Sequence, residues 1–139
     1  MKKVFILTFI ILAVLACKKT KFTPEGPTDV RIKNLTDLTF NEVIIKTSEN
    51  EEDVDTLGNV GPNSYSEYFR FTKAYPKAEI SAMINIGGTF STYSTGTVDF
   101  TYMQYLGQDK ITFEVWISDP DNKKLEIFNV IHDEPLVLK

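Results

Sequence analysis

Apolar residues at every second position are the feature of this sequence that most constrains its fold. From residue 28 onward the dominant period is two, which is typical of β-strands that bury one face. The clearest runs are Ala78, Ile80, Ala82, Ile84 and Ile86, and later Ile111, Phe113, Val115 and Ile117. No helical pattern follows residue 28, so the sequence predicts an all-β domain.

The alternation and the turn residues place the strands. We expect strands at 30–32, 40–47, 54–60, 65–71, 78–86, 89–93, 98–106, 111–117 and 125–131, with a hairpin across Gly87 and Gly88. About seven to nine short strands predict an antiparallel sandwich of the immunoglobulin-like or transthyretin-like kind, with a small barrel as the alternative. Because the chain has one cysteine, no intramolecular disulfide can form and packing alone must hold the fold.

The first 16 residues have the layout of a secretory signal. Two lysines follow Met1, Val4–Ala16 is almost entirely apolar, and a small residue precedes Cys17. This apolar run is shorter than the roughly 20 residues that a membrane-spanning helix needs. We therefore assign residues 1–16 to a signal peptide, 17–27 to a tether and 28–139 to the β domain.

The residues around Cys17 resemble a bacterial lipobox. The sequence VLAC has a branched apolar residue, a variable apolar residue, alanine and then cysteine. The resemblance implies cleavage before Cys17, lipidation of its thiol and anchoring in a membrane, since several acyl chains together bind almost irreversibly.

The residue after Cys17 bears on which membrane is the destination. Lys18, not aspartate, follows the cysteine, so by the same resemblance the outer membrane is favoured. Surface-exported Bacteroidetes-type lipoproteins carry an acidic cluster after the cysteine, whereas lysines stand here, at positions 18, 19 and 21. This departure favours the periplasmic face slightly over the cell surface.

Charge and composition argue against several functions. The chain has 15 basic and 19 acidic residues and a net charge of -4, which does not suit a nucleic-acid-binding protein. His132 is the only histidine, so a catalytic triad would have to be built on it, and its acidic neighbours in sequence would point to the opposite strand face. We therefore predict a protein that is not an enzyme and has no cofactor.

Two acidic stretches are the candidates for a metal site. The first contains Glu49, Glu51, Glu52, Asp53 and Asp55, and the second contains Asp119, Asp121 and Asn122. Neither has the spacing of a helix–loop–helix calcium loop. The prediction is two solvated loops and no metal ion, and calcium at the first loop stays open.

Three aromatic residues are out of phase with their buried neighbours. Trp116, Tyr68 and Tyr105 fall between the residues that alternate toward the core. Exposed aromatic rings suit protein partners or sugars, because tryptophan and tyrosine contribute strongly to such contacts. The alternative is that the three rings lie under a second apolar layer.

The front half of the domain resembles small Bacteroidetes-type lipoproteins of unknown function. The shared features are a turn at Asn34, a Gly-x-Val segment at Gly58 and Val60, and a Ser-x-Tyr strand at Ser66 and Tyr68, followed by the aromatic residues Phe71 and Tyr75. The resemblance implies a β-sandwich in the cell envelope. The family has no assigned activity, so it implies no catalytic residue.

Two functions fit these observations. The first is a lipid-anchored, non-catalytic module that binds an envelope protein or peptide. The second is a carbohydrate-binding accessory lipoprotein that uses Trp116 and neighbouring tyrosines as a stacking surface.

Overall fold

The computed structural model describes residues 26–133, and these residues form eight β-strands. The bounds are β1 Thr28–Asn34, β2 Phe40–Lys46, β3 Val54–Val60, β4 Phe69–Phe71, β5 Glu79–Ile86, β6 Thr89–Ser94, β7 Asp109–Asp119 and β8 Lys124–His132. The all-β class and the strand number are confirmed. The described part of the chain holds no helix long and apolar enough to cross a membrane.

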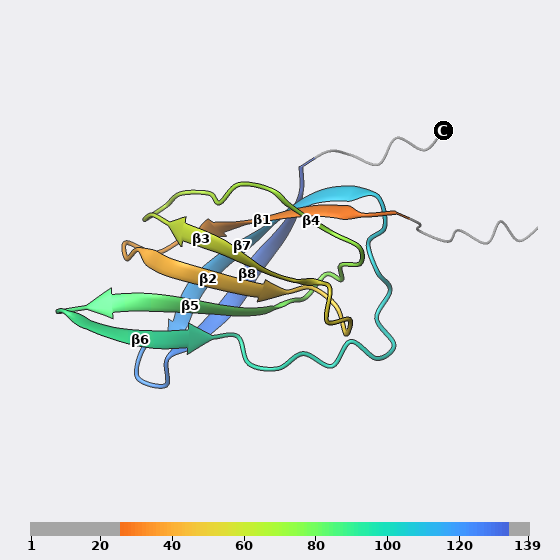
Figure 1. Ribbon diagram of the computed structural model, residues 1–139. Helices are drawn as coiled ribbons and strands as arrows, with labels where there is room; N and C mark the ends of the chain where they lie inside the picture. Colours follow the sequence, from red (N-terminus) through yellow and green to blue (C-terminus); the bar gives the residue numbers. More distant parts are fainter. Residues whose placement is uncertain (1–25, 134–139) are drawn as a thin grey trace, which may run out of the picture.

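The eight strands pair into one sheet of order β3-β2-β5-β6-β8-β7-β1-β4 (Figure 1). The sheet is mixed, so the prediction of a purely antiparallel arrangement was wrong. β1 runs parallel to β7 along its whole length, from Thr28 opposite Asp109 to Asn34 opposite Val115. β6 and β8 are also parallel where they meet, at Ser94 and Lys124.

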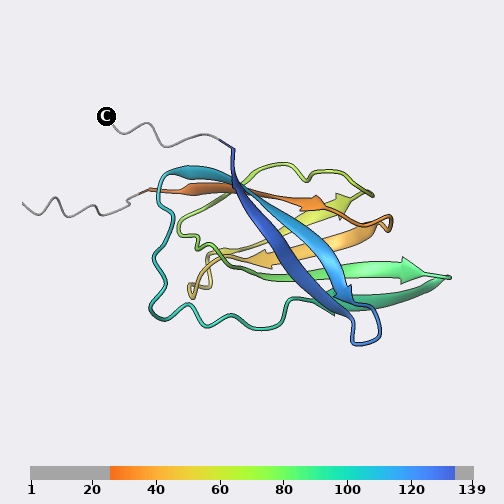
Figure 2. The ribbon, with the colours of Figure 1, turned by 180° about the vertical axis from the view of Figure 1, so that it is seen from behind.

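The sheet folds back on itself until it is nearly a barrel. In the view from behind, the long β7–β8 hairpin crosses diagonally over the layer that contains β2, β3 and β5 (Figure 2). β1 pairs near its start with the edge strand β4, and further along Lys33 forms a bridge to Tyr65. The chain after β3 therefore returns along β1.

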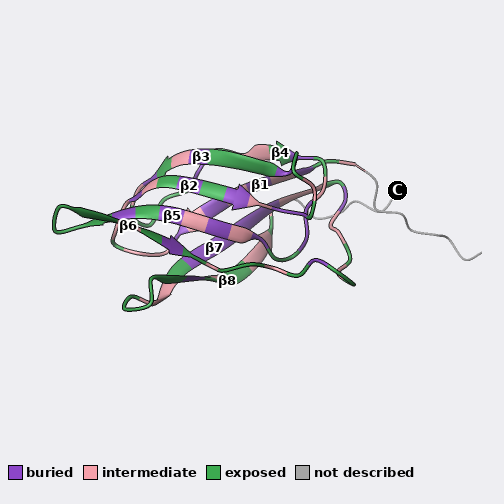
Figure 3. Cartoon of the chain, turned by 60° about the horizontal axis from the view of Figure 1, so that its bottom comes forward, coloured by how far each residue is buried: buried purple, intermediate pink, exposed green. Residues whose placement is uncertain are grey.

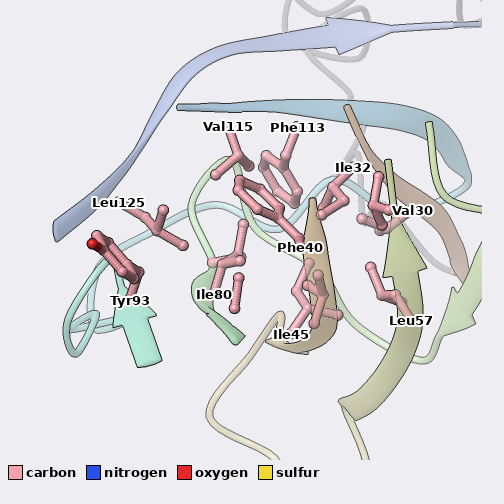
Figure 4. Close-up of a cluster of buried hydrophobic side chains, with 14 of the residues drawn as sticks. Val30, Ile32, Phe40, Ile45, Leu57, Ile80, Tyr93, Phe113, Val115 and Leu125 are labelled. Atoms are coloured by element: carbon pink, nitrogen blue, oxygen red, sulfur yellow. The ribbon is translucent and has the colours of Figure 1, made fainter. Parts of the chain in front are cut away.

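The core lies between the two halves of the folded sheet. Figure 4 shows Phe113 and Val115 of β7 projecting toward Phe40 of β2 and Ile80 of β5. These four side chains are essentially inaccessible to solvent. Along β2 and β5 buried residues alternate with more exposed ones (Figure 3), as the period of two predicts.

Asn34 fixes the turn that leads from β1 to β2. Its buried side-chain amide donates to the carbonyl oxygens of Leu38 (2.7 Å), Val60 (3.3 Å) and Gly61 (3.0 Å). Its side-chain oxygen accepts from the amide (2.9 Å) and hydroxyl (2.7 Å) of Thr36. One buried side chain thus satisfies backbone groups from two turns.

Two expected strands are wrong in whole or in part. The segment 98–106 is irregular, and the chain from residue 95 to 108 contains Gly96, Tyr102 and Gly107 with positive φ. Such residues interrupt the extended backbone that a strand requires. The predicted strand at 65–71 is reduced to β4, because before it only Tyr65 forms an isolated bridge, to Lys33, and residues 66–68 belong to no ladder.

Candidate functional site

The seam between β6 and β8 is the weakest pairing in the sheet. Only Ser94 and Lys124 pair there. The next residue, Thr95, is bound to β5 instead: its amide donates to the Ile80 carbonyl (2.9 Å) and its hydroxyl accepts from the Ile80 amide (2.9 Å). Gly96 then has a φ of 80°, and the chain turns away from β8.

A groove of about 780 Å³ lies along this open seam. β8 contributes one side through residues 124–130, and the irregular segment after β6 contributes the other, with Pro76 and Ala78 nearby. Ile127 and Val130 are only partly buried and pack against the main core. The groove thus has an apolar floor that is continuous with the core, a common property of ligand sites.

On the groove side the backbone of β8 has no second strand partner beyond Lys124, although the Val130 amide donates to the side-chain oxygen of its neighbour Asn129 at 2.9 Å. From Leu125 to Ile131 the strand pairs with β7, and within the described chain no loop donates a backbone hydrogen bond to this stretch or accepts one from it. In a strand with a neighbour on each side, the amides and carbonyls that point away from β7 would bond to the second neighbour. This stretch is therefore a free strand edge inside the sheet.

An exposed aromatic pair lies on the hairpin that carries this edge. The rings of Trp116 and Phe128 are 6.2 Å apart at 74°, and 41% and 66% of the two residues are exposed. Phe128 is an extra residue in the ladder, since Asn129 pairs with Glu114 and Ile127 with Val115. Phe128 points outward, as its alternation with Leu125 and Ile127 predicts, and the bulge shifts the phase of the residues that follow it.

The charges that line the groove are balanced. Lys77 and Lys124 face the groove together with Asp99 and Glu126. Hydrogen bonds from the side chain and then the backbone amide of Thr101 hold the pKa of Asp99 below its ordinary value. With two bases and two acids, the groove does not select for a strongly charged ligand.

The structure does not bring the predicted contact residues together. Trp116 lies on the outer face of the β7–β8 hairpin. Tyr68 lies half-buried between cations, with its ring centre 4.5 Å from the Arg31 guanidinium and 4.6 Å from Lys110. Tyr105 packs edge-on against Tyr75 at 6.3 Å. Cys17 lies outside the described residues.

Arg31 explains the position of Tyr68. Its guanidinium stacks between Tyr65 (4.2 Å) and Tyr68 and donates to the Thr112 hydroxyl (2.9 Å). Burial, followed by a hydrogen bond to Asp133, raises the pKa of the Tyr68 hydroxyl. These contacts hold residues 65–68 on the sheet and favour a structural role for Tyr68.

The acidic residues considered as metal ligands form hydrogen bonds within their own loops instead. Asp53 is buried and accepts from the Ser48 hydroxyl (2.6 Å) and the Lys73 amide (3.1 Å). Asp119 accepts from both the amide and the side chain of Asn122 in the β7–β8 turn. In the described residues no three His, Cys, Asp or Glu side chains gather closely enough to hold a metal ion.

His132 has one close polar contact. Its Nδ1 lies 2.6 Å from the carboxylate of Asp109. This contact ties the histidine, at the end of β8, to the start of the neighbouring strand β7.

Sequence reasoning missed Phe128 and the free edge. The strand expected at 98–106 would place Tyr102 on the same face as Phe100, which was wrong: Phe100 is buried, but Tyr102 is fully exposed. Gly107, Gln108 and Asp109, at the end of this segment, are typical turn residues. No sequence signal indicated the bulge at Phe128.

Comparisons with known proteins add a fold likeness. No protein-family model matches the chain, and no curated protein does. A solved NMR structure of a protein from Eubacterium rectale is similar in fold, with a TM-score of 0.51 and 13% identity over 77% of this chain and 93% of that one. The likeness concerns the fold alone, and the resemblance to Bacteroidetes-type lipoproteins stays a prediction.

Proposed function

We propose that this protein is a non-catalytic binding module that takes an extended polypeptide segment into the groove along β8. The observation that carries the proposal is the free backbone edge of residues 125–131 beside an apolar-floored groove. Strand addition uses such an edge, because the ligand backbone completes the ladder and alternate side chains enter pockets.

The dimensions of the edge fit a short peptide strand. Seven residues at about 3.3 Å each span roughly 23 Å. Side chains that point inward would meet Ile127, Val130 and Met103, whereas the side chains between them would face solvent. The preferred segment is therefore one with apolar residues at every second position and little net charge.

The proposed location is the outer membrane, through a lipid on Cys17. Thr28, at the start of β1, pairs with Asp109, and Ile111 pairs with His132, so both ends of the described chain lie at one end of β7. A tether at 17–27 would hold that end toward the membrane and leave the β7–β8 turn pointing away. The periplasmic face is preferred, so the partner is an envelope protein.

The sandwich class belongs to this proposal as well. The single pair at the seam divides the sheet into two four-stranded halves, which supports an immunoglobulin-like or transthyretin-like sandwich that the seam joins. In such a sandwich the groove is the opening between the two halves along the seam.

Amide hydrogen exchange tests the proposed groove. Linear peptides would be selected against the folded domain from a displayed library, and exchange would be followed by NMR with and without each selected peptide. We expect bound peptide to slow exchange at β8 amides that point away from β7. Binding that leaves every amide from 125 to 131 unchanged would contradict the proposal.

A matched pair of variants locates the binding. Thr97 lines the groove and Thr92 is an exposed residue of β6 outside it. Thr97→Trp fills the groove and should weaken peptide binding at least tenfold, whereas Thr92→Trp should leave it unchanged. Equal affinities of the two variants would place the binding site elsewhere.

A further inference from the structure

A second pocket lies on the other side of the segment that walls the groove. Its volume is about 500 Å³, and its walls come from Lys46, Glu49, Tyr75 and the segment 98–103. Val98, Asp99 and Met103 line both cavities. The two cavities are therefore neighbours that share one wall.

Tyr102 is the unusual residue of this pocket. It is fully exposed and has φ 67°. It stands third in a turn from Phe100 to Met103, which the Met103 amide closes on the Phe100 carbonyl at 3.2 Å. A positive φ at this position favours glycine or asparagine, so neither the backbone nor the core explains a tyrosine here.

Buried rings support the base of the pocket. Tyr75 and Phe100 stack with centroids 5.2 Å apart at 26°, and both are nearly inaccessible. The Thr101 amide donates to the Asp99 carboxylate at 2.9 Å. Aromatic packing and this hydrogen bond hold the turn that presents Tyr102.

The polar groups of the pocket are nearly neutral as a set. Glu49 is bonded to Lys73 at 2.8 Å, and Lys46 lies 3.9 Å from Glu79. Asp99 adds one negative charge. With one net negative charge, this set of donors and acceptors does not favour phosphate or other anions, and its polar walls do not suit an acyl chain.

We propose that this pocket binds a neutral saccharide, with the ring of Tyr102 against the apolar face of a pyranose and Lys46, Glu49 and Asp99 bonded to its hydroxyls. Hydroxyls donate to carboxylates and accept from ammonium groups, so a mixed and balanced set of charges serves them. The aromatic face supplies the apolar contact that such polar ligands otherwise lack. This site is independent of the peptide groove.

NMR titration with chitotetraose, cellotetraose and maltotetraose tests the proposal. At least one of the three should cause saturable shifts of amides 99–103, and Tyr102→Gly should weaken that binding by about tenfold. Tyr102→Phe keeps the ring and should keep most of the affinity. Because glycine suits the backbone conformation at 102, loss of folding does not confuse the result.

Two controls separate this site from the peptide groove. Phe128→Ala removes another exposed ring and should leave saccharide binding unchanged, and Thr97→Trp should reduce peptide binding only. The proposal is overturned if none of the three oligosaccharides shifts amides 99–103 at a ligand concentration of about 10 mM. A dissociation constant weaker than about 10 mM would not indicate a specific site. The proposal is equally overturned if Tyr102→Gly binds as well as the original protein.

Discussion

Trp116 and Phe128 lie edge to face with their ring centres 6.2 Å apart, although Phe128 belongs to a bulge and has no partner of its own in the β7–β8 ladder. An aromatic pair of this kind contributes about 0.5–1.5 kcal/mol beyond its buried area. The pair thus packs two exposed rings against each other on one face of the hairpin, directly beside the bulge.

Phe128→Ala should therefore change the surroundings of the only tryptophan. We expect a red shift of its fluorescence emission and a loss of about 1 kcal/mol in the free energy of unfolding. Phe90→Ala is the matched control, because Phe90 is similarly exposed on β6. An identical emission maximum in the Phe128 variant would contradict the pairing.

Asn34→Ala should destabilise the protein by about 3 kcal/mol, because it leaves buried and partly buried backbone carbonyls of two turns without partners. Asn41→Ala is the control: the side-chain oxygen of Asn41 is buried but has no hydrogen-bond partner in the described chain. We expect this variant to lose much less stability. Urea denaturation of both variants measures the difference, and equal losses would refute the role given to Asn34.

The pair of Asp29 and Arg70 should give stability that depends on pH. Arg70 donates to Asp29 at 2.8 and 3.0 Å between β1 and β4, and this hydrogen bond lowers the pKa of Asp29 from its ordinary 3.8. A lowered folded-state pKa adds stability above the unfolded-state value, and that stability is lost as pH falls through the folded-state value. Asp29→Asn should thus be less stable by about 0.5 kcal/mol at pH 7, since the pair is largely exposed.

The difference between Asp29→Asn and the original protein should vanish in acid. Unfolding free energies measured from pH 7 down to about pH 2 would show the two curves converging below roughly pH 4. Arg70→Gln should show the same convergence, because it removes the other half of the pair. A constant gap over this range would show that Asp29 acts through packing and not through its charge.

Tyr102→Gly should raise the free energy of unfolding by about 1 kcal/mol, because glycine adopts a positive φ without the cost that a Cβ imposes. The exposed ring gives up no core contact. Lys123→Gly should act in the same direction, since Lys123 has φ 53° in the β7–β8 turn. Phe90→Gly, in a regular strand, should destabilise, and thermal denaturation compares the three.

The period of two predicted most of the strands but not their partners. The hairpin across Gly87 and Gly88 is confirmed, with Ile86 opposite Thr89, because a local turn decides it. The parallel pairing of β1 with β7 joins residues about 80 positions apart. Alternation records which face of a strand is buried, and it carries no information on which distant strand lies alongside.

The candidate sites were harder to predict than the strands. The outward position of Trp116 follows from its phase relative to Val115, whereas in β8 a bulge shifts the phase of the residues after Phe128. In the segment 98–106, alternation appeared without a strand, since Tyr102 has a left-handed backbone. Groove and pocket both depend on that irregular segment, so both needed the three-dimensional structure.

The central place of β7 also dictates the order in which the chain can fold. β2, β3, β5 and β6 pair with near neighbours and are complete by Ser94. β1 is made early and can pair on one side with β4 and with residues 64–66, but its other side is open until β7 appears. During synthesis the strand must therefore wait for nearly the last quarter of the chain to pair on both sides, so this protein should fold slowly and late.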